Sequence, residues 1–180
     1  MRIAALRHLP TDANREGLLQ GSRDCKIAPL DDLMVVRIAA RKLEISALGP
    51  FDRVLVSDLC RTMQTAQLYG FEQPVVEPLL RELNFGSFEG KLRSELEAHF
   101  GVSWKENPRR LGLGLGEDML DFEARIKLVL EKHREAQRLL LFGHGAWIRG
   151  LMSIVRHGDI RNMNQLKLEN NELVVLDIEE

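Results

Sequence analysis

Residues 139–150 read LLLFGHGAWIRG, and this stretch decides the fold class. The four large apolar residues at 139–142 predict a buried strand, and the run at 146–156 has the apolar spacing of a helix. His144 stands between them with a glycine on each side, and glycine lets the backbone turn sharply. The stretch therefore predicts a strand, a tight turn and a helix, with His144 at the carboxyl end of the strand.

Further apolar runs bounded by turn or charged residues predict four more strands, at residues 3–6, 54–56, 75–76 and 173–178. Helical spacing predicts helices between them, at residues 32–48, 62–69, 92–100 and 118–136. Strands alternating with helices indicate the α/β class, as a three-layer α/β/α sandwich around a mostly parallel sheet. Asn170-Asn171 lies between two strand-like runs, which predicts a closing antiparallel hairpin and hence a mixed sheet.

The chain has 180 residues, of which 44% are hydrophobic, so we expect one domain spanning residues 1–180. Residues 101–116 form the one long irregular stretch, and it is longer than a simple connecting loop usually is. With its flanking segments, at about residues 87–137, it is predicted to form a helical lid or cap insertion.

Charge argues against a polyanionic partner, because 25 Lys and Arg face 27 Asp and Glu for a formal net charge of -2. We therefore expect a small soluble partner and neither nucleic acid nor a membrane, while a homodimer stays open. No signal peptide and no membrane span is expected from the apolar runs. Cys25 and Cys60 form no CxxC pair, which favours a reducing cytoplasm.

Four charged residues are placed where chemistry is expected. Arg7 and His8 directly follow the strand at 3–6, and ligands of open α/β sheets bind at the carboxyl ends of strands. Arg61 follows the strand at 54–56 in a turn that opens a helix, whose free N–H groups add positive potential. Glu82 follows the strand at 75–76 and supplies a carboxyl group. We expect these side chains to meet His144 in one crevice.

Four segments carry a family resemblance: RHLPTDAN at 7–14 with Gln20-Gly21, SDLCRTMQTA at 57–66, LRELNFGSFEG at 80–90 and FGHGAWIR at 142–149. Together and in this order they resemble the motifs of the histidine phosphatase superfamily, also called phosphoglycerate mutase-like. The resemblance implies a phosphomonoesterase that hydrolyses a small phosphorylated metabolite through a phosphohistidine. It also implies that no metal ion and no cofactor is needed.

The resemblance assigns roles residue by residue. His8 is the nucleophile, and Glu82 protonates the leaving group and later deprotonates water. Arg7, Arg61 and His144 complete the catalytic set by binding the phosphoryl oxygens. Further phosphate or substrate contacts are implied for Thr11, Asn14 and Gly145.

Three matters stay open. Leu9 and Pro10 depart from the family pattern, in which glycine usually follows the histidine, so loop shape and donor count can differ. The acid-bearing segment and the length look closest to α-ribazole phosphatase and broad-specificity phosphatases. The alternatives are a phosphoglycerate mutase, for which the chain looks too short to form a cap, and a catalytically weak phosphate-binding module.

For some other candidate residues, an interpretation without a functional role is favoured. Arg109 and Arg110 could reach a distal acidic group on the substrate, yet a solvated pair is favoured. Cys60 lacks the Cys-x5-Arg cradle of cysteine phosphatases, so we do not expect it to be catalytic.

Overall fold

The computed structural model describes residues 1–178, whose five strands form one sheet in the order β3-β2-β4-β1-β5. The strands are β1 (Arg2–Arg7), β2 (Arg53–Val56), β3 (Val75–Val76), β4 (Arg138–Gly143) and β5 (Leu173–Asp177). Neighbouring strands are parallel except β5, which pairs antiparallel with β1. The predicted mixed and mostly parallel sheet is confirmed.

Seven α-helices are described, and they are α1 (Asp12–Arg15), α2 (Asp32–Leu48), α3 (Cys60–Leu68), α4 (Arg93–Phe100), α5 (Ser103–Glu106), α6 (Met119–Lys132) and α7 (Gly145–His157). Short 3-10 turns add η1 (Pro78–Leu80), η2 (Gly86–Phe88), η3 (Pro108–Arg110) and η4 (Met163–Gln165). None of the helices within residues 1–178 combines the length and the apolar character needed to cross a bilayer.

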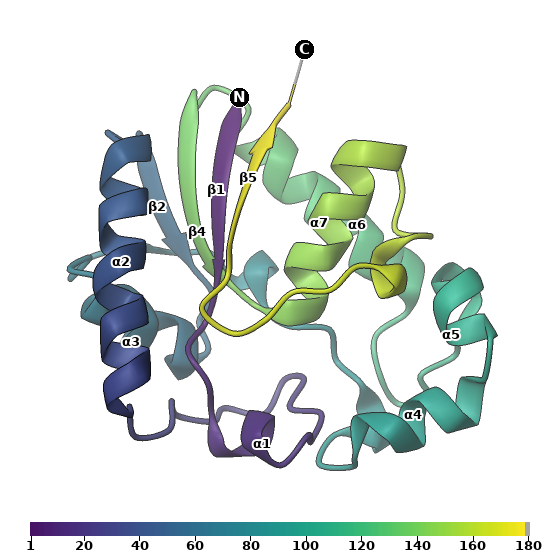
Figure 1. The fold of residues 1–180 in the computed structure, drawn as a ribbon. Helices are drawn as coiled ribbons and strands as arrows, with labels where there is room; N and C mark the ends of the chain where they lie inside the picture. Colours follow the sequence, from purple (N-terminus) through teal and green to yellow (C-terminus); the bar gives the residue numbers. More distant parts are fainter. Residues whose placement is uncertain (179–180) are drawn as a thin grey trace.

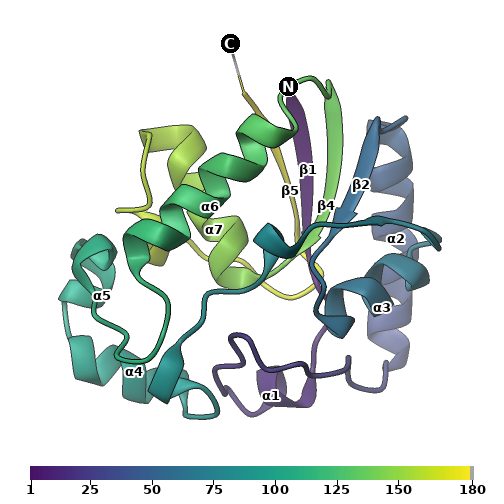
Figure 2. The same ribbon diagram turned by 180° about the vertical axis from the view of Figure 1, so that it is seen from behind.

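Side chains that alternate along the strands form one hydrophobic core on each face of the sheet. In β1, Ile3 and Ala5 pack with α6 and α7, whereas Ala4 and Leu6 pack on the opposite face with α2 and α3. Successive side chains of a strand point to opposite faces, so a strand buried on both sides reads as a continuous apolar run. Figures 1 and 2 show the two helix pairs on either side of the sheet, which confirms the three-layer sandwich.

The lower edge of the sheet in Figure 1 carries the segments that surround the carboxyl ends of the parallel strands. There α1 and α4 lie below the sheet, outside the two helix layers, and α5 lies beside them. The predicted site residues follow β1 and β4 at this edge, as the rule for open α/β sheets requires.

Two sequence-based expectations about the chain path were wrong. No hairpin closes the sheet, because residues 166–169 form no strand and β5 pairs instead with β1. The backbone there serves the site: the Leu168 carbonyl accepts an Arg7 N–H, and the Asn170 side chain donates to the His8 carbonyl. The stretch 101–116 is also less irregular than expected, since it contains α5 and η3.

The lid at about residues 87–137 stays a prediction. Met119, Phe122 and Ile126 of α6 are 0% exposed and belong to the core shared with the sheet. Leu96 of α4 and Trp104 of α5 are buried in the same core, although α4 and α5 lie outside the two helix layers that flank the sheet.

Candidate active site

A cavity of about 220 Å³ lies at the carboxyl edge of the sheet. Six of the predicted site residues line it, namely Arg7, His8, Asn14, Arg61, Glu82 and Gly145. These residues come from sites up to 138 positions apart in the chain, so the fold itself assembles the cluster. The other two predicted residues, Thr11 and His144, lie behind the wall.

His8 is buried at 2% exposure, and its ring orientation is fixed by the next residue. Its Nδ1 lies 2.7 Å from the Leu9 carbonyl oxygen. A carbonyl oxygen can only accept, so Nδ1 carries the proton and Nε2 of the neutral ring keeps a lone pair. Burial, and then the charges of Arg61 and Arg7, hold the pKa of His8 well below its usual range. The neutral, nucleophilic form is thus the stable one at neutral pH.

Leu9, the departure from the family pattern, fits this arrangement. Its side chain is 0% exposed and packs in the core beneath α2 and α3. Its N–H donates to the Thr65 hydroxyl at 3.0 Å, and its carbonyl orients His8. The leucine therefore anchors the loop while the backbone still positions the histidine.

Arg61 is fully buried at the start of α3 and is held on three sides. Its Nε donates to Nδ1 of His144 at 3.2 Å, and its Nη1 and Nη2 donate to the carbonyls of Arg23 and Gly21 at 2.7 and 2.9 Å. Gly21 has a φ of 53° and leaves no room for a side chain, because a Cβ would lie 2.0 Å from the Glu89 carboxylate. A guanidinium has five N–H groups, so two remain for a ligand.

His144 is 0% exposed and both its ring nitrogens are occupied. Nδ1 accepts from Arg61, and Nε2 lies 2.7 Å from the Ser57 hydroxyl. Burial, and then the charge of Arg61, keep the pKa of His144 well below its usual range. His144 is not among the cavity-lining residues and its ring bonds to protein groups, so its direct contact with phosphate stays a prediction.

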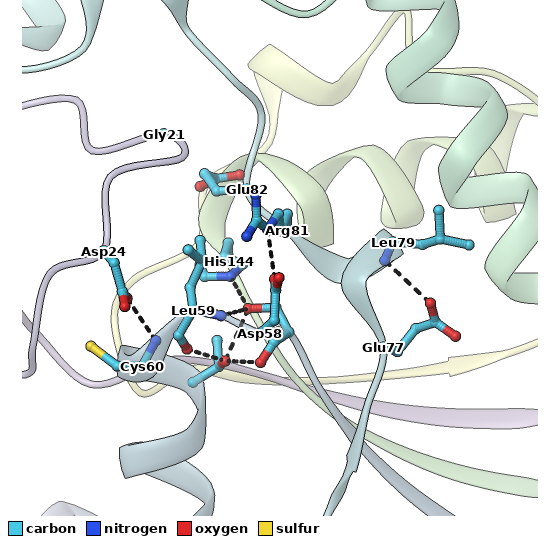
Figure 3. A network of polar contacts seen from close by, with 12 residues as sticks. Gly21, Asp24, Asp58, Leu59, Cys60, Glu77, Leu79, Arg81, Glu82 and His144 are labelled. Carbon is cyan, nitrogen blue, oxygen red and sulfur yellow. Dashed lines mark hydrogen bonds and ion pairs between the residues drawn. The ribbon is translucent and has the colours of Figure 1, made fainter.

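Ser57 explains which nitrogen of His144 carries the proton. The Ser57 hydroxyl accepts from the Leu59 N–H at 3.2 Å and lies 3.0 Å from the Thr62 hydroxyl, which itself donates to a backbone carbonyl. Ser57 thus donates to Thr62 and accepts from Nε2–H of His144. The same tautomer follows from the Arg61 side, because Nε of arginine can only donate. Figure 3 shows His144 and Leu59 within this network, between the Asp24–Cys60 and Asp58–Arg81 contacts.

Glu82 lies at the N-terminus of α7. Its carboxylate oxygens accept the N–H groups of Leu83, Ala146 and Trp147 at 3.0 to 3.1 Å. The first turn of a helix has free N–H groups and favours a carboxylate there. The contacts place a carboxyl group on the cavity wall on a rigid support.

Arg7 lies across from Glu82, with Nη1 donating to the Leu168 carbonyl at 2.6 Å. Burial lowers the pKa of Arg7, while the charge of Glu82 opposes the shift. A Cβ on Gly145 would lie 3.2 Å from Arg7 Cζ and 3.3 Å from Arg149 Nη1. The absence of a side chain at Gly145 lets both guanidinium groups approach the helix start.

Asn14 and Thr11 have different roles from one another. Asn14 Oδ1 accepts from the Thr11 N–H and hydroxyl and from Asn170, which leaves the Asn14 amide nitrogen as a donor on the cavity wall. Thr11 is 0% exposed and caps α1. Thr11 does not line the cavity, and its hydroxyl holds Asn14, so a direct substrate contact of Thr11 stays a prediction.

The sequence analysis gave no site role to several polar or aromatic residues on the cavity wall, among them Gln20, Arg93, Trp104, Arg149, Glu169 and Asn170. Arg149 had a signal, because it stands four residues after Gly145 and so shares a helix face with it. Gln20 lay in a quoted motif without a role. Trp104 of α5 had none, since only the tertiary structure brings residues 101–116 to the cavity.

The structure agrees with the interpretation that Arg109, Arg110 and Cys60 have no role in the cavity. Arg109 pairs with Glu123 at 3.0 Å and with Asp159 at 3.9 Å, and neither it nor Arg110 lines the cavity. Burial raises the pKa of the Cys60 thiol to about 11, so it is protonated at neutral pH and is a poor nucleophile.

A family model described as "Histidine phosphatase superfamily (branch 1)" matches residues 3–180. A curated relative from Hydrogenobacter thermophilus, named "Putative phosphoserine phosphatase 2", is 29% identical over 193 residues, covering 99% of this chain and 90% of that protein. Another from Escherichia fergusonii, named "Probable phosphoglycerate mutase GpmB", is 26% identical over 190 residues, covering 100% of this chain and 86% of that protein.

Among solved structures, the α-ribazole phosphatase from Shigella flexneri is similar with a TM-score of 0.78. Its identity is 24%, and the match covers 100% of this chain and 92% of that chain. At this identity the likeness supports the fold, which agrees with the sandwich in Figures 1 and 2.

Proposed function

The chain belongs to branch 1 of the histidine phosphatase superfamily, and from this premise we propose that it hydrolyses a small phosphorylated metabolite through a phosphohistidine on His8. The observation that carries the proposal is the 2.7 Å contact from His8 Nδ1 to the Leu9 carbonyl. It leaves Nε2 with a free lone pair beside two arginine guanidinium groups, which are the partners of a phosphoryl group.

In the first half-reaction, Nε2 of His8 attacks phosphorus and the bond from phosphorus to the ester oxygen breaks. Glu82, carrying a proton, passes it to the departing oxygen. Arg7 and Arg61 hold the non-bridging oxygens, whose charge they neutralise. The ring of His8 becomes positively charged, and its Nδ1 keeps its proton and continues to donate to the Leu9 carbonyl.

In the second half-reaction, water attacks phosphorus on the side that the leaving group vacated. Glu82 takes a proton from the water, the bond from phosphorus to Nε2 breaks, and neutral His8 is restored together with inorganic phosphate. His144 acts through Arg61, because its Nδ1 accepts the Arg61 Nε–H and thereby fixes the guanidinium plane. Side chains supply the positive charge in this scheme, which favours a metal-independent reaction.

The substrate is proposed to be compact. A cavity of about 220 Å³ lies below the roughly 300–1,000 Å³ typical of sites for drug-sized ligands. This favours a small metabolite over nucleic acid or a membrane surface as the partner. An α-ribazole phosphate, the substrate class implied by one resemblance, would have to extend out of the cavity. The cytoplasm stays the proposed location.

The experiment is a rapid-quench assay with a 32P-labelled phosphomonoester. We expect the wild type to form an acid-labile, alkali-stable phosphoenzyme that His8→Ala abolishes together with turnover. Glu82→Gln should lower kcat about 100-fold to 10,000-fold, the usual contribution of a general acid–base group. Excess chelator should leave kcat within about 2-fold of the untreated value if no metal participates. Phosphoenzyme in His8→Ala would overturn the assignment.

A phosphoglycerate mutase is the second candidate, favoured by the relative named for that activity. Product analysis with 3-phosphoglycerate separates the two, because a mutase returns the isomer and a phosphatase releases inorganic phosphate. The third alternative, a binding module, predicts neither product. Leu9 weakens that alternative, since its carbonyl and N–H keep the His8 loop in place.

A further inference from the structure

Arg149 and Arg7 each have a buried, unpartnered Nε on the cavity wall, but Arg7 is anchored through Nη1 to the Leu168 carbonyl, whereas Arg149 has no hydrogen bond among the described residues. Arg149 is 6% exposed, and its Nε is buried without a hydrogen-bond partner among residues 1–178. Burial lowers the pKa of Arg149 to about 10, so the guanidinium still carries its charge at neutral pH. A buried charge without a partner is costly, which indicates that a ligand supplies the missing partner.

The nearest carboxylate does not serve as that partner. Glu82 is the charge that most raises the pKa of Arg149, yet its oxygens are engaged by the N–H groups of Ala146 and Trp147. Arg93, which also lines the cavity, pairs with Glu97 at 2.8 Å. Glu169 is the other carboxylate on the wall, and its charge acts on Arg7. The positive charge of Arg149 is therefore not paired with a carboxylate among the described residues.

Trp104 supplies a second unpaired donor. It is 2% exposed, lines the same cavity, and its indole N–H has no hydrogen-bond partner among the described residues. The Trp104 carbonyl accepts from Asn164 at 2.9 Å, which anchors α5 to the body of the protein. An indole can only donate, so Arg149 and Trp104 together require an acceptor.

Arg149 reaches the cavity at the start of α7 beside Arg7, because a Cβ on Gly145 would lie 3.2 Å from Arg7 Cζ and 3.3 Å from Arg149 Nη1. The charges of Arg61 and Arg7 act on His8, whereas those of Glu82, Arg93 and Arg7 act on Arg149. In the proposed reaction Glu82 protonates the departing oxygen, and Arg93 and Trp104 line the cavity from α4 and α5. Arg149 therefore has neighbours both at Arg7 and on the α4–α5 side, toward which the part of the substrate that is not transferred would extend.

We propose that Arg149 and Trp104 form a subsite for a second anionic group on the leaving group of the substrate. This inference rests on the proposed function and narrows its substrate class to a phosphomonoester that carries a nearby carboxylate or second phosphate. Arg149 binds the anion through its guanidinium, and Trp104 donates its indole N–H. The subsite replaces Arg109 and Arg110 as the place where a distal acidic group is recognised.

The test compares three small substrates in the wild type: 2-phosphoglycolate, which has a carboxylate, ethane-1,2-diol bisphosphate, which has a second phosphate, and ethyl phosphate, which has neither. We expect kcat/KM for at least one of the two substrates with a second anionic group to exceed that for ethyl phosphate about 10-fold to 100-fold. This is the range for a hydrogen-bonded ion pair. The preferred substrate of the first two identifies the second anion. Equal rates on all three would overturn the proposal without any variant.

Arg149→Met then removes the charge while keeping an apolar stem. It should abolish the preference and leave kcat/KM for ethyl phosphate within about 3-fold of the wild type. Arg156→Met on the exposed end of α7 is the matched control and should change nothing. An equal loss on all three substrates would show that Arg149 serves the transferred phosphoryl group, and the subsite would be rejected.

Trp104→Phe is the second variant, and it keeps the ring packing without the N–H. It should lower kcat/KM about 3-fold to 10-fold, and only for the substrate with the second anion. This variant remains informative if Arg149→Met fails to fold.

A failure of the proposed function can be distinguished from a failure of the proposed subsite. If the wild type released no phosphate from any of the three compounds, calorimetric binding of 2-phosphoglycolate and ethyl phosphate to the wild type and to Arg149→Met would test the subsite alone. Tighter binding of 2-phosphoglycolate that depends on Arg149 supports it, and equal binding overturns it.

Discussion

Arg61 and Arg149 are both buried arginines on one cavity, yet their surroundings are opposite. Arg61 donates to His144 and to two backbone carbonyls, whereas Arg149 has a buried Nε with no partner among residues 1–178. We call His8 and Arg61, with His144 behind them, the catalytic wall, and Trp104 and Arg149 the outer wall. Arg7 lies between the two cases, because its Nη1 donates to the Leu168 carbonyl while its Nε has no partner among residues 1–178. The difference teaches that groups anchored by protein acceptors fix the geometry for chemistry, while groups without such an anchor mark what a ligand must bring.

The physical basis of this difference is the cost of movement. A reacting group must be held close to its productive geometry, so the catalytic wall gains from every partner that restricts it. A recognition group gains most when its partner is the ligand, because a ligand that lacks the matching acceptor leaves the buried donor unpaired. Groups held by protein hydrogen bonds and groups without them, on one cavity, thus indicate two tasks: positioning the reacting atoms and recognising the ligand.

The largest effect that tests this comparison comes from matched arginine-to-lysine variants. Arg61→Lys keeps the charge but loses the planar fork that binds His144, Gly21 and Arg23, so kcat/KM should fall about 100-fold to 1,000-fold. Arg149→Lys should cost less than about 10-fold, since a single ammonium can still pair with an anion. Steady-state kinetics on both variants, with folding checked by circular dichroism, give the comparison. Similar losses would remove the distinction between the two walls.

An intermediate effect is expected on stability as the pH falls. The pKa values of His8 and His144 are held well below the ordinary value, so below about pH 6.5 the unfolded chain binds protons that the folded one does not. The sign is fixed by linkage: stability present above that pH is lost as the pH falls, at up to about 1.4 kcal/mol per pH unit for each histidine.

Urea unfolding at several pH values measures this loss. Variants of the catalytic wall should change it, and His8→Ala should make the acid decline shallower. Arg149→Met, in the outer wall, should leave the slope unchanged. A slope in His8→Ala as steep as in the wild type would contradict the assignment of buried neutral histidines.

The smallest effect is expected from Ser57→Ala, which removes the acceptor for the His144 Nε2 proton. The ring can then rotate or change tautomer, and Arg61 loses part of its support. We expect kcat to fall about 5-fold to 10-fold, as for the loss of one hydrogen bond, with KM nearly unchanged. Ser57→Thr, which keeps the hydroxyl, should recover most of the rate. A change confined to KM would contradict a positioning role.

The strands of the sheet, the longer helices and the residues that end the strands could be read from local patterns, whereas the short helices α1 and α5 could not. Apolar runs and helical spacing found every strand of the sheet, and residues 32–48 match α2 at both ends. These features are local, because the burial of a strand on two faces and the caps of a helix are encoded within a few residues. The residues around Arg7, Arg61, Glu82 and His144 could be recognised in the same way.

The predicted hairpin failed because its outcome depends on a long-range contact. The Leu168 segment reads as a strand, but its carbonyl accepts from Arg7, which lies 161 residues away. The place of Thr11 also depends on such contacts, because its hydroxyl bonds to Asn14, which in turn accepts from Asn170. Neither long-range partner is visible in the local sequence.

The sequence by itself determined the α/β sandwich, the strand ends that carry Arg7, His8 and His144, and the family to which the motifs point. Only the tertiary structure decided which of these side chains reach the cavity and which tautomers the histidines adopt. It also decided that Arg149 Nε and the Trp104 indole N–H have no hydrogen-bond partner among residues 1–178. The physical reason is that pattern and propensity are properties of neighbouring residues, whereas hydrogen-bond saturation depends on every group that the folded chain brings within about 3 Å.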